Sequence, residues 1–286
     1  MKDFVGILSN AQWKLGGIAI ASTIASTLAL APVASAASIR ITVDNLAPDN
    51  GTFLTPAWFG FHDGNFDLYN RNEPITPGLE RLVEDGNFEP LNAEFAAAGN
   101  GSVQGAIFGP ELAFAGPIDP GESTSLVVEL DENAASSRYF SYASMVIPSN
   151  DFFIANGDPL AHQIFDDAGN FLGVDFTLSG AQVLDGGTEV NDELPENTAF
   201  FGQQNPDTGV TEGGGVTLAT GFIPGGNILS SAEFANADFT APGYEVARFR
   251  VELLGDDPTA VPEPGMILGL LAAGGLVAAS RRRQLA

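Results

Sequence analysis

Ser38-Ile39-Arg40-Ile41-Thr42-Val43-Asp44 alternates apolar and polar side chains along its whole length. Because a β-strand places successive side chains on opposite faces of a sheet, this alternation predicts a strand with one buried face. Clusters of Gly, Pro, Asn and Asp separate this stretch from others like it, and this spacing predicts an all-β fold, an antiparallel β-sandwich. The other stretches that we expect to form strands are residues 123–130, 138–147, 171–178, 216–220 and 245–253.

One part of the chain has a helical pattern instead. Thr76-Pro77 is a typical helix start and Gly86 a typical helix end. A second short helical turn is expected over residues 90–97, and residues 192–215 are polar and Gly-rich, which predicts a long loop. The helix that starts at Thr76-Pro77 has three apolar residues on one face: Leu79, Leu82 and Val83.

The N-terminal residues have the pattern of a transport signal. Two lysines precede an apolar stretch over residues 18–30, and Ala34-Ser35-Ala36 follows as a cleavage site of small residues. The pattern predicts a signal peptide over residues 1–36 that is removed by cleavage between Ala36 and Ala37.

The C-terminal residues carry a second signal. Val261-Pro262-Glu263-Pro264 leads into an apolar run over residues 266–279 and then into arginines at 281–283. As a helix this run would cover roughly 21 Å, less than the ~30 Å hydrocarbon core of a membrane. A short span with cytoplasmic arginines fits temporary retention, and a plain membrane anchor is the alternative.

The order of motif, apolar helix and basic stop resembles the PEP-CTERM sorting tail of Gram-negative bacteria, with Pro262, Glu263 and Pro264 as the sorting motif. The resemblance implies an exosortase-type processing protease as a partner. It also implies a membrane contact before processing, and delivery to the cell envelope or extracellular matrix. The chain then divides into a signal peptide (1–36), a β-sandwich domain (37–257) and a sorting tail (258–286).

The residues between the two signals are strongly acidic. They include six arginines and no lysine against 34 acidic residues, a net charge of about −28. This argues against nucleic acid as a partner, because phosphate binding needs clustered basic side chains. Two interpretations of the acidity remain, which are compatible: a solvated, self-repelling surface, or carboxylates that bind divalent cations.

The composition also limits the possible chemistry. The chain has no cysteine, which excludes disulfides, thiolate catalysis and cysteine metal sites. With His62 and His162 as its two histidines, a three-histidine zinc site is impossible and a Ser-His-Asp triad has few ways to form. We therefore expect a protein that is not an enzyme, with His62 in a structural or surface role.

Two segments place carboxylates where they could meet. The stretch from Phe140 to Phe153 is an aromatic and β-branched strand that stops at Pro148 and then presents Asp151 beside two phenylalanines, which we expect in the core. Asp185-Gly186-Gly187-Thr188-Glu189 holds two carboxylates around a Gly-Gly turn, so that both can point onto one ion. Calcium prefers such hard oxygen ligands from irregular loops. Without a cation, two carboxylates 4 Å apart would repel by about 4 kcal/mol at an effective dielectric near 20.

At these residues the chain resembles the spondin N-terminal domain family, the domain shared by F-spondin and mindin. That family shows Ser-Met-x-x-Pro-Ser-Pro-Asp-Trp and later Asp-Ala-Gly-Thr-Asp, which are similar to Ser144–Phe152 and Asp185–Glu189 of this chain. The segments at 78–86 and 245–252 resemble the family as well, and the resemblance covers roughly residues 38–254.

The resemblance implies a β-sandwich that binds calcium near one end and acts, without catalysis, in cell-surface or matrix adhesion. Its ligands would be Asp151, Asp185 and Glu189, and its adhesion partner an exopolysaccharide or a surface protein. This sequence departs from the family pattern at Asn150, Phe152 and Glu189, where the family has proline, tryptophan and aspartate. The longer Glu189 keeps a carboxylate and leaves the calcium affinity open, and the cysteines of the animal members are absent.

Each of these assignments has an alternative. Asp151 could cap a turn after Pro148, and the other two carboxylates could be ordinary residues of a Gly-rich loop. The protein could instead be an envelope hydrolase that acts on polysaccharide with a carboxylate pair, although the sequence shows no sign of one across a cleft. A matrix filler that binds cations diffusely is the third possibility.

Overall fold

The computed structural model describes residues 36–110 and 116–255 of the 286-residue chain. Residues 1–35 of the predicted signal peptide (1–36) and the predicted sorting tail from residue 258, with its apolar helix at 266–279, lie outside the described residues, whereas Ala36 is described. Across the two described ranges, none of the helices has the length and apolar character that crossing a membrane requires.

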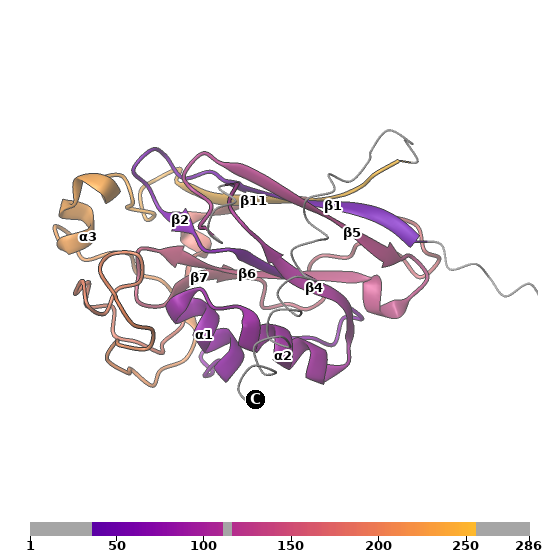
Figure 1. Ribbon diagram of the computed structural model, residues 1–286, viewed down its shortest axis with the longest axis horizontal. Coiled ribbons are helices and arrows are strands. Elements are labelled where there is room, and N and C mark those ends of the chain that lie inside the picture. The colour runs from indigo at the N-terminus through magenta and orange to yellow at the C-terminus, as the bar shows by residue number, and fades with distance from the viewer. Residues whose placement is uncertain (1–35, 111–115, 256–286) are drawn as a thin grey trace, which may run out of the picture. The chain divides into compact units, whose positions relative to one another are not determined.

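The described residues form two antiparallel sheets, as the sequence predicts (Figure 1). The first sheet has the order β5-β1-β11-β8. The second has the order β10-β9-β7-β6-β3-β4, and β2 pairs with β6 beside this path. The strands of the first sheet are β1 (Ala36–Asn45), β5 (Ser123–Asp131), β8 (Val174–Ser179) and β11 (Glu245–Leu253). Those of the second are β2 (Phe53–Leu54), β3 (Ala57–His62), β4 (Gly101–Ile107), β6 (Tyr139–Ile147), β7 (Phe152–Ala155), β9 (Leu184–Asp185) and β10 (Thr217–Leu218).

Strand β1 confirms the prediction made from its alternation. Ile39, Ile41 and Val43 are fully buried in the core between the sheets. Burial of such side chains stabilises the fold by roughly 1.5–3 kcal/mol each. Antiparallel pairing of β1 with β11 sets Ile39 opposite Leu253, so that the start of β1 and the end of β11 lie side by side.

Strand β6 is buried on both faces, which explains why its sequence does not alternate cleanly. Phe140, Tyr142 and Val146 point into the core between the two sheets. Ala143 belongs to a second apolar cluster on the other face of the sheet, where Phe153 of β7 also lies. A sheet that carries apolar residues on both faces needs a cover on each side.

Two helices provide that cover, α1 (Pro77–Asp85) and α2 (Glu89–Ala98), which lie against the second sheet (Figure 1). Helix α1 begins and ends as predicted. The Leu79 amide donates to the Thr76 hydroxyl at 3.3 Å, and Gly86 takes the left-handed conformation with φ 67°. The predicted turn at 90–97 is the inner part of α2. The remaining short helices are α3 (Asn227–Ser230) and the 3₁₀ turns Ala135–Ser137, Gly180–Gln182 and Ala232–Phe234.

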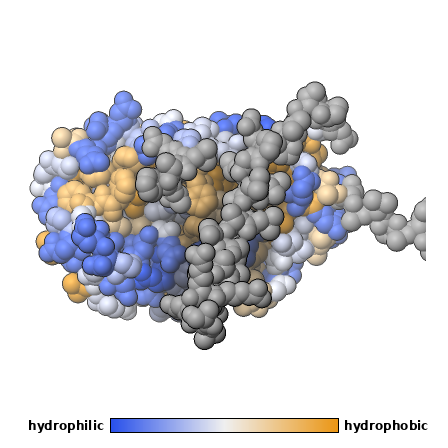
Figure 2. All heavy atoms as spheres, in the orientation of Figure 1, coloured by the Kyte–Doolittle hydropathy of each residue, from blue (hydrophilic) through white to orange (hydrophobic). Residues whose placement is uncertain are grey.

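The surface near α1 is hydrophilic. Seen from the side of Figure 1, hydrophilic side chains cover α1 and the loops beside it, and a hydrophobic area lies above them (Figure 2). The loop that connects β9 to β10, residues 186–216, holds no named helix or strand, in agreement with the predicted loop at 192–215. Of the predicted calcium ligands, Asp185 directly precedes this loop and Glu189 lies near its start. The candidate site therefore includes the beginning of this loop.

Candidate metal centre

Asp151 lies in the connection between β6 and β7 and is fully buried. Its Oδ2 accepts three hydrogen bonds: from the Thr188 amide at 2.8 Å, the Thr188 hydroxyl at 3.1 Å and the Glu189 amide at 3.1 Å. Its backbone carbonyl accepts a fourth from the Gly186 amide at 3.1 Å. Asp151 therefore holds the loop after β9 in place, and its Oδ1 accepts a hydrogen bond from the Asn191 side-chain amide.

Asp185 ends β9, directly opposite Phe152 in the pairing of β7 with β9. This register brings it beside Asp151, as the calcium hypothesis requires. The side-chain amide of Asn191 joins the two, because its Nδ2 donates to Asp151 Oδ1 and to Asp185 Oδ2, each at 3.1 Å. Sequence reasoning missed Asn191, because no sequence motif marks this residue of the loop.

Asn191 also bears on the fit of a cation. The oxygen and nitrogen of a side-chain amide occupy nearly the same space, and their positions follow from the hydrogen-bond network. A half-turn of the Asn191 amide replaces the donor with a carbonyl oxygen that faces both carboxylates. Asp151 Oδ1, Asp185 Oδ2 and Asn191 Oδ1 would then be three hard oxygen ligands, the kind that calcium prefers.

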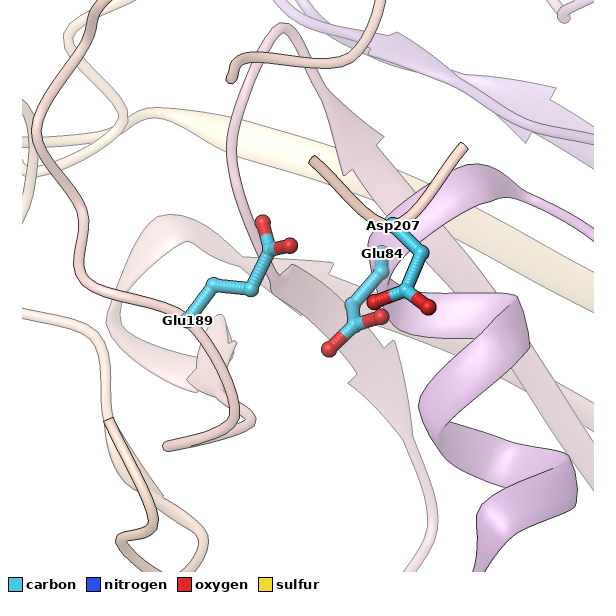
Figure 3. Close-up of side chains that lie close together, drawn as sticks. All are labelled: Glu84, Glu189 and Asp207. Carbon is cyan, nitrogen blue, oxygen red and sulfur yellow. The ribbon is translucent and has the colours of Figure 1, made fainter. Parts of the chain in front are cut away.

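Glu189, the third predicted ligand, groups with two other carboxylates. One oxygen each of Glu84, Glu189 and Asp207 lies within 4.8 Å of the others (Figure 3). Glu189 Oε1 accepts a hydrogen bond from the Gly209 amide at 2.9 Å, and a side chain at Gly209 would collide with this carboxylate. The structure thus brings Asp151 and Asp185 together and aims Glu189 toward α1.

A stretch of sequence after the sandwich matches a known sorting motif. The PEP-CTERM protein-sorting motif matches residues 260–284. This motif marks an exported protein that exosortase recognises and processes, and it implies sorting to the cell envelope or surface of a Gram-negative bacterium. No curated protein matches the chain. The predicted sorting motif Pro262, Glu263 and Pro264 falls within the matched range, outside the described residues.

For an exported protein, a weak calcium site would be sufficient, because extracellular modules bind calcium with dissociation constants of roughly 10⁻⁴–10⁻³ M. Burial raises the pKa of Asp185 to about 6, and the nearby charge of Asp151 adds to this shift. Burial likewise raises the pKa of Asp151, against the hydrogen bonds that it accepts. A cation favours the ionised carboxylates and would reverse both shifts.

The two histidines do not take part in these carboxylate groups. His62 is fully buried, its Nδ1 accepts from the Gly64 amide at 3.0 Å and its Nε2 lies 2.9 Å from the Ser141 hydroxyl. Burial lowers the pKa of His62 and that of His162 to about 4. His62 is thus a neutral structural residue, as interpreted from the sequence. Phe152 and Phe153 are buried in the two apolar clusters, which confirms their prediction as core residues.

Without calcium, we expect the melting temperature to fall by a few degrees between pH 6.5 and pH 8. Burial raises the pKa of Glu84 and of Glu189 from the ordinary 4.5 to about 7, so the folded state binds more protons than the unfolded chain in this range. Its stability is therefore lost as pH rises through the folded value. The charges that face the pair are Arg81, which opposes the shift, and Glu80, Asp207 and Asp151, which increase it.

The measurement is a thermal melt in a chelating buffer, of the wild type and of Glu84→Gln. The two histidines oppose this trend near pH 6.5, because they are neutral in the folded state and still partly protonated in the unfolded chain. Glu84→Gln leaves their contribution unchanged, so the difference between the two melting curves reports Glu84. Glu84→Gln should lose much of the slope. A melting temperature that is constant or rises up to pH 8 in the wild type would contradict the prediction.

Proposed function

We propose that this exported protein is a non-enzymatic, calcium-binding module that acts in adhesion at the cell surface or in the extracellular matrix, with a spondin-like sandwich. The observation that carries the proposal is the meeting of Asp151 and Asp185, which lie 34 positions apart in sequence, on either side of one side-chain amide. The sorting motif supports the location of the activity, outside the cytoplasm.

The donor set supports a hard cation such as calcium over softer metals. Carboxylate and amide oxygens are hard ligands, and the chain has no cysteine to favour a softer ion. Asp151 would offer Oδ1, because its Oδ2 accepts three hydrogen bonds from the loop. Glu189 supports this site only indirectly, because its backbone amide donates to Asp151, and its carboxylate lies with Glu84 and Asp207 instead.

Adhesion is the role that suits such a module. A bound ion would fix the first residues of the 186–216 loop against the β6–β7 connection and so present an ordered surface at this end of the sandwich. An exopolysaccharide or a surface protein is the partner we propose for it. The hydrolase alternative needs a carboxylate pair across an open cleft, whereas Asp151 is fully buried, so we expect no turnover on a panel of polysaccharides.

Calcium at 5 mM should raise the melting temperature of the purified full-length chain by roughly 5 °C if the dissociation constant is ~10⁻⁴ M. The rise follows because an ion that binds the folded state alone shifts the unfolding equilibrium. Asp185→Asn should abolish most of this rise, since it removes one charge from the pair. Magnesium at the same concentration is the control for ionic strength.

Asp175→Asn is the matched control variant. Asp175 pairs with Arg248 on the exposed face of β8, away from the candidate site, and its exchange should leave the calcium response intact. The calcium proposal fails if calcium gives no more stabilisation than magnesium, or if Asp185→Asn retains the full response.

A further inference from the structure

A second group of carboxylates joins three distant parts of the chain. Glu84 comes from the last turn of α1, Glu189 from the beginning of the 186–216 loop and Asp207 from its middle (Figure 3). Glu84 and Glu189 are each only 3% exposed, whereas the side chain of Asp207 is 77% exposed. The group therefore has a buried inner side and an open rim through which an ion can enter.

The group contains a buried oxygen without a partner. Glu189 Oε1 accepts from the Gly209 amide, and the nearby Asn150 side chain lowers the pKa of this carboxylate, but Oε2 has no partner within hydrogen-bond geometry among the described residues, although it is inaccessible to solvent. The carboxylate extends toward Glu84 and Asp207 (Figure 3). An unpaired charged oxygen is costly to bury, more so than an unpaired neutral group. A ligand between the three side chains would supply the missing partner.

The local charge has the sign and size that a divalent cation can balance. Arg81 Nη1 lies 3.3 Å from Glu84 Oε2 and 3.7 Å from Asp207 Oδ2, and Arg81 also forms an ion pair with Asp85. Arg81 thus pairs with three carboxylates, and Glu189 adds a fourth that Arg81 does not contact. The Asp207 amide donates to Asp85 Oδ1 at 3.2 Å, so the loop already returns to this end of α1.

We propose that Glu84, Glu189 and Asp207 form a cation site of their own, which takes calcium and fastens the middle of the 186–216 loop to helix α1. Calcium takes 6–8 oxygen ligands with flexible geometry, and three carboxylates plus water from the open rim can provide them. The site goes beyond the proposed function, because Glu84 and Asp207 belong to no ligand set implied by the spondin resemblance. It neither requires nor excludes an ion at Asp151 and Asp185.

The test is isothermal titration calorimetry of the full-length chain with calcium chloride alone, on the wild type, Glu84→Gln and Asp207→Asn. Each variant should lose one binding event or weaken it at least tenfold. Glu80→Gln is the matched control, since it removes a carboxylate from the same helix, outside the group, and should bind as the wild type does. Asp207 is exposed, so its variant keeps the test decisive even if Glu84→Gln does not fold.

Limited proteolysis with a glutamate-specific protease gives a second measurement. Glu196 and Glu212 are exposed in the 186–216 loop, and calcium should slow their cleavage several-fold in the wild type and in Glu80→Gln. Asp207→Asn should be cleaved equally fast with and without calcium. A loop that calcium protects equally in Asp207→Asn would overturn the proposal.

The variants also separate this site from the one at Asp185. If Asp185→Asn abolishes calcium binding and the variants of Glu84 and Asp207 do not change it, the second site is refuted and the proposed function stands. If the opposite pattern appears, the cation binds at the second site and the assignment to Asp151 and Asp185 fails. A wild type that binds no calcium refutes both.

Discussion

Asp151→Ala is expected to lower the free energy of unfolding by about 3–5 kcal/mol, the range seen when a buried charged partner is removed. Alanine leaves the amides of Thr188 and Glu189 and the Thr188 hydroxyl without their acceptor, whereas the Asn191 amide keeps Asp185. An unsatisfied buried donor costs about 1–3 kcal/mol, and partial relaxation keeps the sum below three times the upper value. The melting temperature should fall by roughly 10 °C. Urea denaturation measures the difference directly.

Asp151→Asn is the control that separates hydrogen bonding from charge. Its carbonyl oxygen can still accept the three hydrogen bonds from the loop, so less than half of the stability loss should remain. The calcium response should nevertheless disappear, because the ligand charge is gone. Equal destabilisation by alanine and asparagine would show that Asp151 does not act through these hydrogen bonds, and a loss below ~0.5 kcal/mol for alanine would place it among ordinary surface substitutions.

Trp58→Ala should cost about 3–5 kcal/mol, since large-to-small changes of buried aromatic residues lose transfer energy and leave a cavity. Trp58 is fully buried on the outer face of the second sheet. Its ring packs against Phe66 and Phe95, with centroids 6.0 and 5.5 Å away, and its Nε1 donates to Asn92 Oδ1 at 2.9 Å. The change removes the ring contact with Phe95 and the hydrogen bond to Asn92, both of which join α2 to the sheet.

Trp58→Phe should cost only about 1–2 kcal/mol, because it keeps an aromatic ring and loses the hydrogen bond and part of the volume. Both variants are compared by urea denaturation and near-ultraviolet circular dichroism. If the alanine variant unfolds at nearly the same urea concentration as the phenylalanine variant, then contacts other than those of Trp58 hold α2 on the sheet.

The fold was predictable where one face of an element is buried. The alternation of Ser38 to Asp44 and the capping pattern of Thr76 and Gly86 located β1 and α1 nearly to the residue, because both are local signals. Strands β3 and β4 were missed. All six residues of β3 are buried, so it has no polar face to alternate, and β4 contains two glycines that weaken its strand pattern.

The site was predictable only in part. Asp151 and Asp185 are brought together by the pairing of β7 with β9, a strand of two residues that no sequence pattern reveals. Asn191 and Glu84 join their groups through long-range packing, of the loop onto β7 and of α1 onto the sheet, and neither carries a local signature. The sequence motifs located the loop; which carboxylate faces which partner depends on how that loop folds back on α1.

The antiparallel pairing of β1 with β11 also sets how the domain can be displayed. Ala36 and Leu253 leave the sandwich at the same end, whereas α1 and the 186–216 loop lie toward the other end (Figure 1). β11 spans nine residues, about 30 Å of extended chain. Any tether through the sorting tail therefore reaches the domain at the end remote from the acidic loop. Such a tether would leave the carboxylates of Asp185, Glu189 and Asp207 toward the free end of the sandwich.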